Sequence, residues 1–304
     1  MRMRVLSTTR SSVTAAWTTL LLTFALGPAA AISAEVTTRT VYVTVTDGKG
    51  APVTDLTAAN FKVKEAGKER EIVKAEPAKA RPRMALMVEE RLMPDQATRV
   101  GLFEFVKRLN GAAEISLITV GLRNTTVTPY VTDPNVVLRA INELSLNPQP
   151  TSNLTEGIND IAKIFEQQRP ERPVIVVVGF SGGQAGGASA SSILNQLRQS
   201  AATLYAVTYG PPGTAGGSNL GTMGDESGRE QVLGDGAKQT GGRRTDVVST
   251  GSIPKALEQV ADDLAAQYLI TYALPDGVKP DRRFSITTDR KGVSLRAPSG
   301  LPDK

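Results

Sequence analysis

The sequence predicts an α/β fold with a doubly wound, mainly parallel sheet, and a small β domain formed by the two ends of the chain. Predicted strands alternate with predicted helices from Met84 to Gln267, the order that produces a parallel sheet covered on both sides. The runs Met84–Val88 and Val174–Val178 are continuously apolar, as in strands buried on both faces. Short alternating segments flank this region at both ends.

Residues 1–34 resemble a secretory signal peptide rather than part of a fold. A basic start (Arg2, Arg4 and Arg10) precedes the apolar stretch Leu20–Leu26, and small residues follow it. Cleavage is expected after Ala31 or Ala34. The apolar stretch is shorter than the ~20 residues that a spanning helix needs. We therefore expect a mature protein that is secreted, periplasmic or held in the cell envelope, with no transmembrane segment after cleavage.

Composition narrows the classes of function. The formal charge of +5 falls to +2 once the three arginines of the leader are removed, so the charge indicates no nucleic-acid partner. The chain has no cysteine, which excludes disulfides and thiolate metal sites. It also has no histidine, and this removes the commonest general base and the commonest transition-metal ligand.

The two ends of the mature chain both read as β structure. In the segment 36–76, Val41, Val43 and Val45 alternate with polar residues, and Asp47–Gly50 is a turn signal. The segment 268–300 contains further short alternating strands. Because isolated hairpins are marginally stable in water, we expect these segments to pack together. Their place would be the side of the α/β domain away from the carboxyl ends of its strands.

The α/β domain is expected over residues 83–267. Its remaining strands are expected at Ile115–Val120, Thr125–Val131 (an edge), Leu204–Thr208 and Arg243–Val248. Its helices are expected at Asp95–Leu109, Pro134–Leu144, Ser152–Gln168, Ser191–Ser200, Gln231–Gln239 and Ile253–Gln267. Gly179–Ser189 and Gly210–Gly228 are interpreted as loops, the second as a flexible one. The adjacent acids Glu89 and Glu90 are interpreted as solvated charges.

This order of elements resembles the von Willebrand factor A domain, a Rossmann-like fold. The lead-in Val43–Val53, followed by Leu56–Val63, is similar to that of a von Willebrand factor A-related group typical of Acidobacteria. The tail Tyr268-Leu269-Ile270-Thr271-Tyr272 resembles the same group's tyrosine-bearing strand. The resemblance covers nearly all of residues 36–300. It implies an exported, non-catalytic module that binds a protein partner, such as a component of the cell envelope.

The family's usual chemistry is a metal-ion-dependent adhesion site built from hard oxygen ligands that suit Mg²⁺. By resemblance, Glu89 stands for the site's aspartate, Arg91 and Met93 for its two serines, and Ser152 for its threonine. Phe180-Ser181-Gly182 stands where a second aspartate is expected. Methionine is a poor ligand for a hard cation, and an arginine charge opposes it. The sequence thus predicts a degenerate site, with no metal ligands and no cofactor, and it disfavours Mg²⁺.

The residues at these positions form the predicted partner-binding site. It consists of Glu89, Arg91, Met93, Ser152, Phe180 and Ser181. In open α/β sheets, ligands approach the carboxyl ends of the strands, where these residues are expected. Arg91, Met93 and Phe180 are expected to contact the partner in place of an ion, because arginine, methionine and aromatic residues are enriched at interfaces. The alternative is that Met93 and Phe180 only cap the core.

A second interpretation is a serine hydrolase. Gly179-Phe180-Ser181-Gly182-Gly183 fits the G-x-S-x-G pattern and follows a buried strand. Without histidine the usual triad cannot form, although a serine–lysine pair stays open. The pattern also needs a helix directly after the serine, where Gly182–Ser189 reads as a loop. The sequence therefore favours a binding protein over an enzyme.

Overall fold

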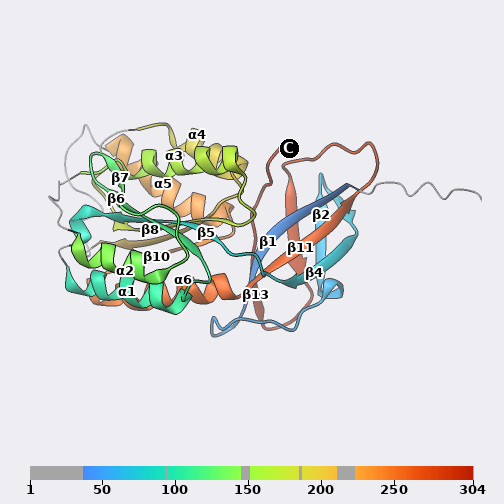
Figure 1. Cartoon of the computed structure of the whole chain (residues 1–304). Coiled ribbons are helices and arrows are strands. Elements are labelled where there is room, and N and C mark those ends of the chain that lie inside the picture. The colour runs from blue at the N-terminus through green and yellow to red at the C-terminus, as the bar shows by residue number, and fades with distance from the viewer. Residues whose placement is uncertain (1–36, 94, 145–150, 185–186, 211–222, 304) are drawn as a thin grey trace, which may run out of the picture. The chain divides into compact units, whose positions relative to one another are not determined.

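The structure, a computed structural model, describes residues 37–93, 95–144, 151–184, 187–210 and 223–303 (Figure 1). The predicted signal peptide and part of the predicted loop Gly210–Gly228 lie outside the described residues. Val36–Lys304 form one compact unit. The finer division into 36–76, 83–267 and 268–300 therefore stays a prediction.

The central sheet has six strands in the order β10-β9-β8-β5-β6-β7. They are β5 (Arg83–Glu89), β6 (Glu114–Val120), β7 (Asn124–Thr126), β8 (Pro173–Phe180), β9 (Thr203–Tyr209) and β10 (Arg243–Val247). All pairs are parallel except β6–β7, which is antiparallel. The edge strand was predicted over Thr125–Val131, but β7 is shorter and covers Asn124–Thr126. The chain leaves β5 toward β6 on one side and reaches β8 on the other. Such a switch in direction opens a crevice at the carboxyl ends of the strands.

Helices cover both faces of this sheet (Figure 1). One layer holds α1 (Gln96–Leu109), α2 (Pro134–Glu143) and α6 (Ile253–Ala265), and the other holds α3 (Leu154–Gln168), α4 (Ala190–Gln199) and α5 (Met223–Gln239). Alternate residues of β5 divide between the two cores. Leu86 packs with the first layer and Met87 with the second. Side chains alternate across a strand, which explains why β5 is apolar throughout. The predicted fold class is confirmed.

One element departs from the expectation. The chain is helical from Met223, so residues 223–228, which were interpreted as part of a flexible loop, belong to α5. The reason is a buried helical face: Arg229, Val232, Leu233 and Ala237 recur at intervals of three and four residues, and all are buried. The two internal glycines, Gly234 and Gly236, lower helix propensity but do not outweigh this packing.

The chain ends form the small β part of the molecule. Its strands are β1 (Thr37–Asp47), β2 (Phe61–Glu65), β3 (Lys68–Arg70), β4 (Ile72–Pro77), β11 (Gln267–Leu274), β12 (Phe284–Thr288) and β13 (Val293–Arg296). They build two sheets, β13-β1-β11-β4 and β12-β2-β3. Each sheet joins residues from both ends of the chain, since β1 pairs with β11 and β13 while β2 pairs with β12. A core that includes Val43, Phe61 and Tyr272 lies between them.

This β part is attached at the amino ends of the parallel strands. β4 leads into β5, and β11 begins directly after α6. Arg172, just before β8, connects the β part to the α/β part. Its guanidinium donates to the side chain of Gln267, the first residue of β11, at 2.8 Å and to the carbonyl of Ala80, between β4 and β5, at 3.0 Å. The carboxyl ends of the sheet are left for other contacts. Within the described ranges, no helix has the length and apolar character needed to cross a membrane.

A buried tyrosine makes the stability of this fold sensitive to high pH. Tyr205 in β9 is fully buried, and burial raises its pKa to about 12, with Asp263 adding to the shift. An unfolded tyrosine loses its proton near pH 10. At this residue the unfolded chain therefore ionises first, and Tyr205 alone should lower the free energy of unfolding by about 2–3 kcal/mol as pH rises from about 10 to about 12.

Urea unfolding of the wild type and of Tyr205→Phe across this range measures the effect. The variant should lose less stability between the two pH values. Tyr209→Phe, at the partly exposed end of the same strand, is the matched control and should follow the wild type. Equal slopes for all three proteins would contradict the assignment to Tyr205.

Candidate binding site at the carboxyl ends of the strands

The site is built around Glu89, the last residue of the central strand β5. Its side chain is fully buried, so the interpretation of this residue as a solvated charge is wrong. The physical reason is its position, because β5 is flanked on both sides by β6 and β8 at this level of the sheet. Glu90, one residue later, is half-buried. A buried carboxylate needs a compensating charge and hydrogen bonds.

Two neutral groups donate hydrogen bonds to the Glu89 carboxylate. The hydroxyl of Ser152, just before α3, donates to Oε1, and the backbone N–H of Phe180 donates to Oε2. Gly179 makes the second bond possible. A Cβ at this position would lie 2.5 Å from Glu89 Oε2, closer than real Cβ atoms approach. Any other residue here would push the carboxylate away from β8.

The compensating charge is Arg229, which α5 brings to the carboxylate. Its Nη2 lies 2.7 Å from Glu89 Oε2 and its Nη1 lies 3.3 Å from Oε1, and both side chains are fully buried. The same guanidinium donates to the carbonyl of Phe180 at 2.6 Å and to the hydroxyl of Ser152 at 3.3 Å. One arginine thus ties together the end of β5, the end of β8 and the start of α3.

A second arginine lies at the mouth of the site. Arg91 follows β5 in a short 3-10 turn, Glu90–Leu92, and its side chain is 20% exposed. Its Nη2 donates to the carbonyl of Gly182 at 2.7 Å and lies 3.4 Å from Glu89 Oε1. Its guanidinium lies 4.1 Å from the centre of the Phe180 ring, a cation–π contact. Burial lowers the pKa of Arg91, and Glu89 opposes this shift.

These residues do not fit a divalent cation. The oxygen ligands that the sequence retains, Glu89 and Ser152, both bond to Arg229. Two guanidinium groups contact the single carboxylate, and their charges would repel an ion placed beside it. In the part of the chain that the structure describes, acidic side chains nowhere gather in groups of three or more that could hold a metal ion.

Apolar side chains continue this edge along the sheet. In strand order, Val248 follows β10, Tyr209 ends β9, Phe180 ends β8 and Leu122 follows β6. Val248 is 67% exposed and Leu122 is 50% exposed. Phe180 and Tyr209 are half-buried and contact each other edge to face, with ring centres 5.4 Å apart. We call Val248, Tyr209, Phe180 and Leu122 the edge row.

The structure brings together four of the six predicted site residues, namely Glu89, Arg91, Ser152 and Phe180. Ser181 follows Phe180, is half-buried, and donates its backbone N–H to the carbonyl of Tyr209 at 2.9 Å. Met93 is fully buried in the core, so the alternative that it only caps the core is confirmed for this residue, and the expectation that it contacts a partner is wrong. It packs in the same cluster as Leu102 and Phe105 of α1, where an apolar side chain is more stable than in water.

Sequence reasoning missed Arg229, which lies between the stretch interpreted as a loop, Gly210–Gly228, and the predicted helix Gln231–Gln239. A signal was present, because Arg229 lies three and four residues before Val232 and Leu233 and so shares their helical face. It also missed the requirement for Gly179, which depends on a contact between two strands.

No family model and no curated protein matches this sequence. Several solved structures are similar to it. The structural neighbours are von Willebrand factor A domain proteins.

A von Willebrand factor type A protein from Catenulispora acidiphila is 8% identical, with a TM-score of 0.44 over 84% of this chain and 71% of that one. BatB from Bacteroides thetaiotaomicron is 17% identical, with a TM-score of 0.44 over 61% of this chain and 98% of that one. Proximal thread matrix protein 1 from the mussel byssus is 12% identical, with a TM-score of 0.47 over 63% of this chain. The match spans 49% of the mussel protein's length.

The Glu89–Arg229 pair leads to a prediction about stability. Arg229→Met removes the buried compensating charge and should cost about 3–5 kcal/mol of unfolding free energy, because Glu89 is left without its main partner. In the double variant Glu89→Gln/Arg229→Met the buried carboxylate is also removed, and much of this loss should be recovered, because Arg91 is partly exposed and keeps its hydrogen bond to the carbonyl of Gly182. Chemical denaturation of the wild type, both single variants and the double variant measures the coupling. Additive losses would show that the two side chains do not act as a pair.

Proposed function

We propose that this chain is an exported, non-catalytic protein-binding module whose carboxyl-edge site is closed by an internal arginine instead of a metal ion. The partner would contact the edge row and Arg91. The observation that carries the proposal is the edge row itself, where exposed or half-exposed apolar side chains follow four strands of the sheet. The leader-like residues 1–34 support export, and the cell envelope or the medium is the proposed location.

The composition of this edge favours a protein partner. Interfaces are enriched in aromatic side chains and arginine, and their anchors lie near the centre of the contact. Phe180, Tyr209 and Arg91 are grouped at the middle of the sheet edge, with Val248 and Leu122 on either side. Arg91 is held over the Phe180 ring by the carbonyl of Gly182, so little side-chain entropy is lost on binding. Met93, being buried, has no part in this contact.

The geometry around Ser181 supports a serine hydrolase less well than it supports a binding module. A nucleophile elbow places its serine between a strand and a helix that starts directly after it. Here α4 begins only at Ala190, with Gly182–Ser189 between. The half-buried Ser181 lies beside Phe180 at the rim, where it can contact a partner.

A capture experiment tests the edge row. A double variant, Leu122→Ser/Val248→Ser, should capture at least about tenfold less partner from the native envelope or medium than the wild type does. Val73→Ser is the matched control, because Val73 on β4 is 56% exposed but lies in the small β part. Capture should also be indifferent to a chelator. Loss of capture in the chelator would contradict the metal-free mechanism, and equal capture by all variants would move the site elsewhere.

A further inference from the structure

The first strand of the chain is only half covered along its outer edge. β1 pairs with β11 over Thr37–Thr44, but β13 pairs with its other side only over Thr44–Asp47. Among the described residues, no strand pairs with this outer side from Thr38 to Tyr42. An open strand edge is a template for another extended chain.

The register identifies the backbone groups that face this open edge. Val45 donates its N–H to the carbonyl of Ala266 at 3.0 Å, on the β11 side. In a strand, the N–H and C=O of one residue point to the same side and alternate along the chain. The groups of Thr38, Thr40 and Tyr42 therefore point away from β11, toward the open edge. Thr44, next in this series, faces Arg296 of β13.

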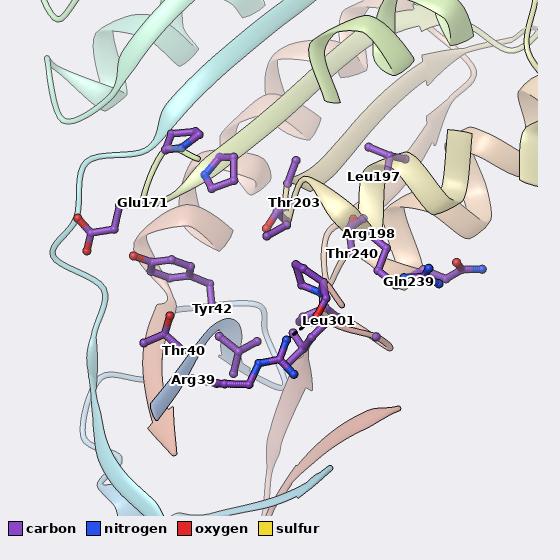
Figure 2. A pocket seen from close by; sticks show the side chains of 18 of the residues that line it. Arg39, Thr40, Tyr42, Glu171, Leu197, Arg198, Thr203, Gln239, Thr240 and Leu301 are labelled. Carbon is purple, nitrogen blue, oxygen red and sulfur yellow. Dashed lines mark hydrogen bonds between the residues drawn. The ribbon is translucent and has the colours of Figure 1, made fainter. Parts of the chain in front are cut away.

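A cavity of about 340 Å³ lies along this edge (Figure 2). Thr40 and Tyr42 line one side, and Leu197, Arg198 and Gln239 line the other. The C-terminal residues form the remaining wall. β13 ends at Arg296, Pro298 bridges to Thr240, and Arg39 donates to the carbonyl of Pro302 at 2.6 Å. The chain therefore turns away from β1 at the point where a longer β13 would have filled the edge.

Two buried polar atoms in the lining have no hydrogen-bond partner among the described residues. They are the hydroxyl of Tyr42 and the Nε of Arg198. Burial, followed by the charge of Glu171, raises the pKa of Tyr42 to about 12, so the hydroxyl keeps its proton at neutral pH. Both atoms are then donors, and since both are fully buried, each side chain must rotate slightly before it can reach an acceptor in the cavity. A buried donor without a partner is costly, which favours an occupant that supplies acceptors.

We propose that the open edge of β1 from Thr38 to Tyr42 binds an extended peptide segment of a partner protein, which adds to the sheet as a strand beside β1. The peptide's alternate backbone groups would pair with Thr38, Thr40 and Tyr42, and an acidic side chain or carbonyl would accept from Arg198 and Tyr42. Strand addition of this kind takes affinity from the backbone and specificity from pockets for alternate side chains. This site is separate from the edge row, which lies at the opposite ends of the parallel strands.

The probe is a phage-displayed library of short random peptides, selected against the full chain. Selected peptides should contain β-branched residues and an acid. Thr40→Pro removes an outward N–H while leaving the pairing with β11, and it should weaken their binding at least about tenfold. Thr40→Val, which keeps the N–H, is the matched control and should bind as the wild type does. Arg198→Ala should weaken binding of the acidic peptides.

An N-methyl scan of a selected peptide tests the same proposal on the unmodified chain. Methylation at every second residue should abolish binding, while methylation at the residues between should be tolerated, because only alternate amides of an added strand face β1. The proposal would be overturned if the loss of peptide binding did not alternate from one methylated residue to the next, or if the peptide still bound the Thr40→Pro variant. A selection that yields no peptide, either from the full chain or from a chain that begins at Glu35, after the second of the two cleavage sites expected, would also overturn it.

Discussion

The buried ion pair between Glu89 and Arg229 is the interaction on which the arrangement of the carboxyl edge depends. It joins the central strand β5 to α5, and through Ser152 and Phe180 it also fixes the start of α3 and the end of β8. Burying two charges is costly, so such a pair persists only with good geometry and with its remaining hydrogen bonds satisfied. Here the carboxylate accepts from a hydroxyl, a backbone N–H and the guanidinium. Much of the cost of desolvation is thus offset within one compact cluster, although the Nε of Arg229 has no hydrogen-bond partner among the described residues.

The same pair decides the chemistry of the edge. A carboxylate and a serine hydroxyl are oxygen ligands of the kind that bind Mg²⁺, yet each is bonded to a guanidinium that carries positive charge into the site. Arg91 adds a second positive charge at the mouth. What remains available to a partner is the rim, made of Arg91, Phe180 and the exposed side chains beside them. This is why we propose recognition by apolar and aromatic contacts instead of capture of a carboxylate by an ion.

Most of the fold could be predicted from local pattern. Burial of a strand on one face produces an alternating apolar pattern, and burial on both faces produces a continuous apolar run. The first pattern is seen at Val41, Val43 and Val45, and the second at Met84–Val88, so both strands could be predicted from the sequence. The start of α5 could not be placed in this way. Its first residues are polar and glycine-containing, and its buried face includes an arginine, which a hydrophobicity pattern counts against burial.

The candidate site was predictable only in part, for a related reason. The positions of Glu89, Arg91, Ser152 and Phe180 follow from the ends of strands and the start of a helix, which pattern can locate. The burial of Glu89 could not be inferred, since it depends on what packs over it, and the burial of Met93 was one of two alternatives that the sequence left open. Arg229 enters from a helix 140 residues further along the chain, and nothing local to Glu89 indicates it.

The central claim is that a guanidinium, and not a metal ion, neutralises Glu89. The most direct measurement is an anomalous-difference map from crystals of the full chain grown with manganese, a heavier stand-in for magnesium. The account predicts electron density for the Arg229 guanidinium within hydrogen-bonding distance of the Glu89 carboxylate, and no manganese peak beside it. A manganese peak bound by Glu89 and Ser152, with Arg229 turned away, would contradict it.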